Sequence, residues 1–220
     1  GDQIKNGTTA TSLSIERGFL GQTTPSYIVN KGMVCGQLDI QISSKQKINL
    51  STTWMGLSGG VSTTALDASP DAQTTGQVMA ANANVGRLAE GGSRLTSPNW
   101  AMEFSLSINN NLRTNESVDE SSPVAIREGE CTVSGSINTY FGSKDMLEKF
   151  YNGTVTSFNS RVAKNNQAII LQIPRVTLRG GGNPAASGKN QDVMASFEYS
   201  GSKDDTTGAS VVIDRMEYFA

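Results

Sequence analysis

Histidine is absent from this chain of 220 residues. Its absence excludes Ser-His-Asp and Cys-His catalysis, the usual zinc sites and the side chain that most often moves protons near neutral pH. The two cysteines, Cys35 and Cys131, lie far apart among alternating apolar residues, so they form neither a disulfide framework nor a metal motif. We expect two buried free thiols, with a single disulfide as the alternative, and we predict no metal and no cofactor.

Charge and long apolar runs are also scarce. Only 17% of the residues are charged, and 18 basic residues nearly balance 20 acidic residues. No basic patch stands out, which argues against a grip on nucleic acid through its phosphates. No apolar run approaches the ~18–20 residues of a membrane helix, and no signal peptide is visible. The chain opens with Gly1 rather than Met, which leaves a trimmed N-terminus or a lost leader open.

The chain is rich in Ser, Thr, Asn, Gln and Gly, a composition that suits strands and turns. Apolar and polar residues alternate in about nine segments, for example Leu38–Ile42, Met102–Ile108, Cys131–Phe141 and Val193–Tyr199. Strict alternation is typical of half-buried antiparallel strands. About nine such strands predict a mainly β protein, an antiparallel sandwich or barrel, formed as a single domain by residues 1–220.

One segment has a helical pattern. Residues 143–152 predict a short α-helix with Ser143 as N-cap and Asn152-Gly153 as the stop. A helix of this length is not stable alone, so we expect it to flank the sheet. Its predicted packing face consists of Met146, Leu147 and Phe150.

Residues 57–75 are predicted to form a long loop, because they hold Gly59-Gly60 and Pro70 and show little periodicity. Connections of this length in a compact domain are usually functional or mobile. Folded back as an arm, the segment could reach roughly 30 Å, enough to touch a neighbouring subunit. The apolar anchors of this candidate inter-subunit arm are Leu57, Val61 and Leu66.

Acidic side chains gather in a third segment. They are Glu116, Asp119, Glu120, Glu128 and Glu130. Two of them could act as acid and base in a glycoside hydrolase, but a solvated loop and strand start is the favoured interpretation. An acidic surface that repels nucleic acid is a third. Glu128 and Glu130 have the same parity and are predicted to share a strand face.

The two tryptophans could serve as platforms for sugars. Trp54 is in phase with Ile48 and Leu50, which favours a core position. Trp100 has the parity of the face of Met102, which makes it a second candidate for the core. Neither stands in an aromatic cluster. A monomeric carbohydrate-binding or adhesin β-sandwich is therefore the alternative reading of the chain.

The order of the segments gives a further indication. In sequence order they are TSLSIERGF (11–19), NKGMVCGQLDIQI (30–42), INLSTTWMG (48–56), FSLSINNNL (104–112), CTVSGSINTYF (131–141), DMLEKFYN (145–152), LQIPRVTL (171–178) and VVIDRMEYF (211–219). Their order and spacing resemble the major tail tube proteins of long-tailed bacteriophages with non-contractile tails, over nearly the whole chain. Related proteins usually have further sequence before the first of these segments, so the resemblance predicts a truncated N-terminus.

The resemblance implies a structural virion protein and no enzyme. Such proteins form six-fold rings, and the rings stack into a hollow tube around a tape-measure protein, in contact with tail-tip proteins. The genome passes through the lumen without specific binding. The implied location is the virion tail, assembled in the host bacterial cytoplasm, with no membrane. Within that picture we expect the 57–75 arm to contact the next subunit or ring. We expect part of the acidic set to line the lumen, because like charge keeps DNA from sticking.

Overall fold

The computed structural model describes residues 1–9, 11–73 and 78–217. The strands up to the middle of the chain are β1 (Asp2–Lys5), β2 (Leu13–Phe19), β3 (Ser26–Ser43), β4 (Asn49–Met55), β5 (Ser58–Ser62), β6 (Val85–Glu90), β7 (Ser93–Arg94) and β8 (Ala101–Asn109). The later strands are β9 (Arg113–Asn115), β10 (Ala125–Arg127), β11 (Thr132–Tyr140), β12 (Thr156–Lys164), β13 (Gln167–Gly181), β14 (Ala185–Ala186), β15 (Val193–Gly201) and β16 (Val212–Met216). The helices are α1 (Ala81–Asn84) and α2 (Asp145–Tyr151).

A single antiparallel sheet holds fourteen of these strands, which confirms the predicted mainly β class. Its main path runs β2-β3-β8-β11-β15-β13-β12-β6-β7, while β9 and β10 form a separate hairpin. The long strand β13 changes neighbours along its length, since Ala168–Gln172 pair with β16 and Val176–Gly181 pair with β15. The sheet therefore divides at β13 into two layers.

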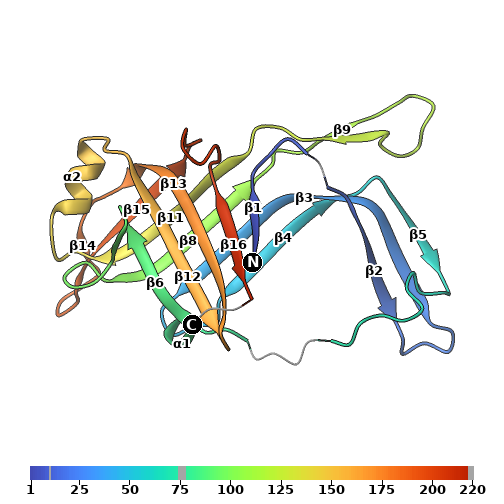
Figure 1. The fold of residues 1–220 in the computed structure, drawn as a ribbon, viewed down its shortest axis with the longest axis horizontal. Coiled ribbons are helices and arrows are strands. Elements are labelled where there is room, and N and C mark those ends of the chain that lie inside the picture. The colour runs from blue at the N-terminus through green and yellow to red at the C-terminus, as the bar shows by residue number, and fades with distance from the viewer. Residues whose placement is uncertain (10, 74–77, 218–220) are drawn as a thin grey trace.

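The two layers enclose one hydrophobic core (Figure 1). Phe104 of β8 and Phe158 of β12 are not on neighbouring strands, yet their ring centroids lie 6.0 Å apart in an edge-to-face arrangement. Tyr199 of β15 completes the aromatic centre, 4.9 Å from the Phe158 ring. Along β8, Phe104, Leu106 and Ile108 are buried, while the residues between them face outward. The period of two in the sequence thus decides which side chains fill the core.

The predicted helix is present as α2, within the expected 143–152. Its N-cap is Lys144, not Ser143 as predicted. Met146 is buried in the core, and Leu147 and Phe150 pack against the core. The one-turn helix α1 was not predicted, because four residues are too few to show a helical period.

Strand β3 extends well beyond the sandwich (Figure 1). Its second half pairs with β4 and β8 inside the sandwich, whereas its first half pairs with β2 and β5. We name the three-stranded projection of β2, residues 26–33 and β5 the arm. Residues 58–62, predicted to be loop, are therefore a strand of the arm, and residues 74 and 75 of the predicted loop lie outside the described residues.

Candidate assembly surfaces

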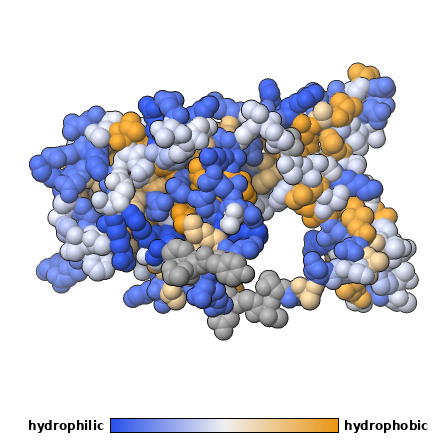
Figure 2. Space-filling view, in the orientation of Figure 1, coloured by the Kyte–Doolittle hydropathy of each residue, from blue (hydrophilic) through white to orange (hydrophobic). Residues whose placement is uncertain are grey.

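One face of the arm exposes apolar side chains across all three strands. Arg17 of β2 lies opposite Ile28 of β3, and Ile28 lies opposite Val61 of β5, so the three side chains point the same way. Ile28 is 39% exposed and Val61 is 78% exposed. The guanidinium carbon of Arg17 lies 5.1 Å above the centroid of the Phe19 ring, a cation–π contact on the same face. Figure 2 shows hydrophobic residues gathered over this end of the molecule.

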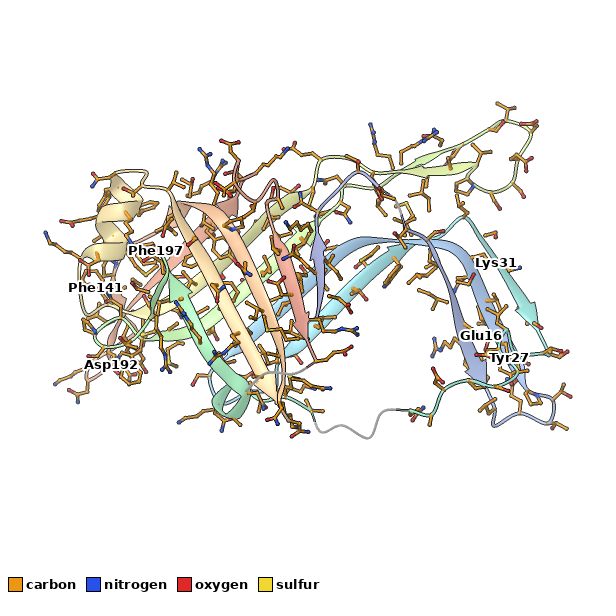
Figure 3. All side chains as sticks on the ribbon, in the orientation of Figure 1. Glu16, Tyr27, Lys31, Phe141, Asp192 and Phe197 are labelled. Atoms are coloured by element: carbon orange, nitrogen blue, oxygen red, sulfur yellow. The ribbon has the colours of Figure 1, made fainter. Side chains whose placement is uncertain are left out.

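The opposite face of the arm is covered by the chain that leaves β5. The backbone N–H of Leu66 donates to the Glu16 carboxylate at 2.6 Å, which ties the segment after β5 across β2. Val29, which pairs with Glu16 and points to the same side, is buried. Figure 3 places Glu16, Tyr27 and Lys31 on the arm. The arm therefore has one face that the segment after β5 partly covers and one open face.

The three apolar anchors predicted for the 57–75 segment have different surroundings. Val61 stands on the open face, and Leu66 is largely exposed near β2. Leu57 is half-buried against Gly32, whose φ of +64° marks a kink in β3. The backbone N–H of Leu57 donates to Lys31 O at 3.0 Å. Their role between subunits stays a prediction.

A second surface is the outer face of the layer formed by β4, β3, β8, β11 and β15. Residues between the buried positions of these strands face outward and are small and polar. We name this surface the serine face; it comprises Gln37, Asp39, Gln41, Ser51, Ser105, Ser107, Ser134, Ser136, Ser196, Glu198 and Ser200. These positions hold two acids and no base.

Hydrogen bonds organise the serine face. Gln37 Nε2 donates to both carboxylate oxygens of Asp39, at 3.0 and 2.9 Å, and to Ser107 Oγ at 3.3 Å. The hydroxyls of Ser105 and Ser136 lie 2.9 Å apart. Hydrogen bonds from Ser107 and Gln37 lower the pKa of Asp39, so this carboxylate is anionic at neutral pH.

The outer face of the other layer has a different charge pattern. Arg87 of β6 lies opposite Arg161 of β12, which lies opposite Ile170 of β13, followed by Asp214 of β16. Asp214 accepts hydrogen bonds from Gln3 at 2.6 Å and from Gln172. The serine-face positions themselves hold no arginine, while β13, which pairs with β15 beside them, has Arg175 and Arg179 among its exposed residues.

The predicted acidic residues lie on and beside the β9–β10 hairpin, which projects from the sandwich near the arm (Figure 1). Glu116, Asp119 and Glu120 stand in the loop that joins the two strands, and Glu128 and Glu130 follow β10. Residues 128–131 lie outside the strands, so the predicted common strand face of Glu128 and Glu130 is wrong. Gly129 N donates to Asn110 O at 2.9 Å, which holds this segment beside the end of β8. The structure leaves the lumen assignment of the five acids a prediction.

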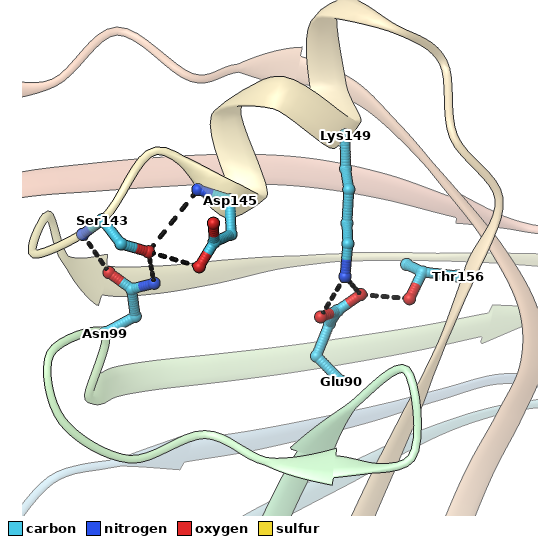
Figure 4. A network of polar contacts seen from close by, with 6 residues as sticks. All are labelled: Glu90, Asn99, Ser143, Asp145, Lys149 and Thr156. Carbon is cyan, nitrogen blue, oxygen red and sulfur yellow. Dashed lines mark hydrogen bonds and ion pairs between the residues drawn. The ribbon is translucent and has the colours of Figure 1, made fainter.

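Side-chain bonds fix α2 at the end of the sandwich remote from the arm (Figure 4). Lys149 Nζ lies 2.7 Å from a carboxylate oxygen of Glu90 on β6, and the Thr156 hydroxyl also donates to Glu90. Asn99 accepts from the backbone N–H of Ser143 at 2.8 Å and donates to Ser143 Oγ at 2.7 Å. These contacts hold the helix against the loop before β8.

The cysteines and tryptophans only partly match the predictions. Cys35 and Cys131 are free, as expected, but half-buried rather than buried, and burial raises the pKa of both thiols. Trp54 is half-buried and donates Nε1–H to Thr52 Oγ1 at 2.9 Å. Trp100 is 59% exposed, so its predicted core position is wrong, because it precedes β8 beyond the last core position of the strand.

The described residues contain no group of three or more His, Cys, Asp or Glu side chains that could hold a metal ion. Neither of the helices in the described ranges has the length and hydropathy that crossing a bilayer requires.

Comparison with known proteins places this geometry in a family. No curated protein matches the chain. The profile of the phage tail tube proteins matches residues 1–201, most of the chain and nearly all of the sandwich and arm. This family is structural and has no enzymatic activity, which excludes the glycoside hydrolase interpretation. The chain belongs to the phage tail tube protein family, whose members are components of the virion tail.

Proposed function

We propose that copies of this chain form six-fold rings, that the rings stack into a hollow tail tube, and that the phage genome passes through its bore into the host. Self-assembly into a tube follows from the family. The six-fold symmetry, the stacking, the contacts with tape-measure and tail-tip proteins and assembly in the host cytoplasm are parts of the proposal.

The observation that carries the proposal is the open apolar face of the arm. When a partner fully buries a side chain as exposed as Val61, the burial stabilises the complex by about 1.5–3 kcal/mol. The arm projects from the sandwich, so its open face can reach another copy without disturbing the core. We propose that this face, with Val61 of the predicted anchors, contacts the next subunit or ring. Leu66 is exposed on the segment that crosses the other face, and its anchoring role stays a prediction.

Unpaired sheet edges support the same conclusion. Among the described residues, β2, β4 and β5 each bond to β3 alone and leave their other edge unpaired. Such edges favour pairing with another chain. Contacts between unlike surfaces of identical copies either close into rings or continue as open filaments. A stacked tube uses closed contacts within each ring and open-ended contacts between rings.

We propose the serine face as the wall of the bore. Sliding DNA is held back by lysine and arginine, which bind its phosphates, and the serine face has neither. Asp39 and Glu198 add negative charge that repels the phosphates. The other outer face, with Arg87 and Arg161 opposite one another, suits this role less. The lumen role expected for Glu116, Asp119, Glu120, Glu128 and Glu130 stays a prediction. A matched set of variants at Glu128 and Glu130 distinguishes it from the serine-face proposal.

The test is negative-stain electron microscopy of the purified chain over a concentration series. Hollow tubes or rings are the expected result. A variant carrying Ile28→Lys and Val61→Lys should remain folded and monomeric at concentrations where the parent assembles. The matched control, Ile28→Val with Val61→Ile, keeps the face apolar and should assemble as the parent does. Normal tubes from the lysine variant would overturn the role of the arm.

A further inference from the structure

An open groove lies where the edge of β6 meets the beginning of β8. Its volume is about 190 Å³, and its floor is apolar, formed in part by Leu88, Leu95 and Phe104. Trp100 forms one wall and is 59% exposed. Arg87 and Arg94 line the groove together with one acid, Glu103. We name it the arginine groove.

One N–H donor of Arg87 has no hydrogen-bond partner among the described residues. One of its terminal nitrogens donates to Gly92 O, while its Nε is buried and has no partner in the described part of the chain. Arg161 lies opposite Arg87 on β12, so arginines are concentrated beside this edge of the sheet. A carboxylate is the acceptor that best matches a guanidinium, because it can take two parallel hydrogen bonds.

The tip of the β9–β10 hairpin has the complementary chemistry. Between the two strands, residues 116–124 include Glu116, Asp119 and Glu120 and no basic residue. Val118 is fully exposed at the tip. The Ser117 hydroxyl donates to Asp119, and this hydrogen bond lowers the pKa of Asp119. The hairpin therefore presents an apolar knob surrounded by anionic carboxylates.

The hairpin and the groove of one molecule cannot meet. The groove lies at the Ala101 end of β8, and the hairpin leaves the sandwich after Asn109. Nine residues of strand span about 30 Å, so the two surfaces lie at opposite ends of the same strand. A contact between them joins one copy to the next in a single direction, the heterologous geometry that a repeating assembly needs.

We propose that the acidic tip of the β9–β10 hairpin of one copy docks in the arginine groove of the next, with Val118 on the apolar floor and carboxylates on Arg87 and Arg94. The proposal rests on the proposed function, because it supplies one of the contacts along the tube. It places Glu116, Asp119 and Glu120 between copies. The occupant is a second copy of this chain, chosen by the complementary charge of the two surfaces.

Two charge-reversal variants test the contact in the full chain. The hairpin variant carries Asp119→Lys and Glu120→Lys, and the groove variant carries Arg87→Glu and Arg94→Glu. Each alone should raise the concentration needed for assembly at least tenfold. An equimolar mixture should assemble like the parent, because every hairpin then finds a groove of opposite charge. Asp205→Lys and Lys203→Glu, on the exposed loop after β15, form the control pair and should change assembly little.

The outcomes separate this proposal from the proposed function. Parent tubes together with single variants that assemble normally, or with a mixture that fails to restore assembly, would overturn the docking contact and leave the tube intact. A parent that forms no ring or tube at any concentration would overturn the proposed function. In that case sedimentation velocity of the mixture still tests the contact, since the two variants should associate with each other and not with themselves; no association would overturn it.

Discussion

Lys149 on α2 donates to both carboxylate oxygens of Glu90 on β6, at 2.8 and 2.7 Å, and so joins two elements 59 residues apart. Glu90 is only 8% exposed, and the Lys149 side chain is about one-third exposed. The pair fixes the helix against the end of the sandwich. Loss of Lys149 would leave a buried charge on Glu90, whereas loss of Glu90 would leave Lys149 partly exposed to water.

The change Lys149→Met should lower the free energy of unfolding by about 3 kcal/mol, the lower end of the range for a broken buried pair, because it leaves the Glu90 carboxylate buried without a counter-charge. Urea unfolding of the monomer measures the loss. Lys144→Met is the control, since Lys144 forms an exposed pair with Glu148 one turn along the same helix, and it should change stability little. Equal losses from the two variants would contradict the structural role of Glu90.

Gly135→Ala should lower the free energy of unfolding by about 3 kcal/mol, because the added Cβ has no room. It would stand 2.0 Å from Ser105 O and 2.5 Å from the Tyr199 hydroxyl oxygen. The close approach is what lets Tyr199 donate to Ser105 O at 2.7 Å across the sheet. Thermal unfolding compares this variant with Gly60→Ala, whose added Cβ would meet no atom within 4 Å. An unchanged melting temperature for Gly135→Ala would show that the strands shift to accept the methyl group.

Stability should fall as pH rises above about 10, the ordinary pKa of tyrosine. Burial raises the pKa of Tyr199, so the folded protein keeps a proton that the unfolded chain releases. The contribution of Tyr199 is thus fully present below pH 10 and is lost above it, by about 1.4 kcal/mol per pH unit. Denaturant unfolding at pH 9 and pH 11 should show this excess loss in the parent relative to Tyr199→Phe. Parallel losses in both would contradict the assignment.

Basic charge on the bore wall should slow genome release. Phage particles carrying Asp39→Lys and Glu198→Lys should form tails of normal length and eject DNA at least about tenfold more slowly, because lysines in the wall attract phosphates. The neutral pair Asp39→Asn and Glu198→Gln controls for loss of the acids. DNA release measured by dye fluorescence gives the rate.

A matched set places the same charge change on Glu128 and Glu130. If these lysine variants slow release and the serine-face variants do not, the sequence-based lumen prediction holds and the serine face lies elsewhere. If only the serine-face variants slow release, the wall is as proposed here.

The sequence by itself determined the local structure. Alternation of apolar and polar residues decided the strands and their buried faces, as for Phe104, Leu106 and Ile108, because the side-chain period of a strand is a local property. The same reasoning placed α2 to within two residues at its start, where Lys144 and not Ser143 is the N-cap, and its apolar face on the core. The order of segments was sufficient to identify the family.

Only the tertiary structure decided the surfaces. Residues 58–62 have no strand period, and they become β5 because their backbone groups bond to β3. The arm exists because β3 continues past the sandwich and exchanges β4 and β8 for new neighbours. Pairs such as Arg87 with Arg161, and Glu90 with Lys149, come from strand order and helix docking. Such pairings depend on contacts between distant segments, which no local pattern encodes.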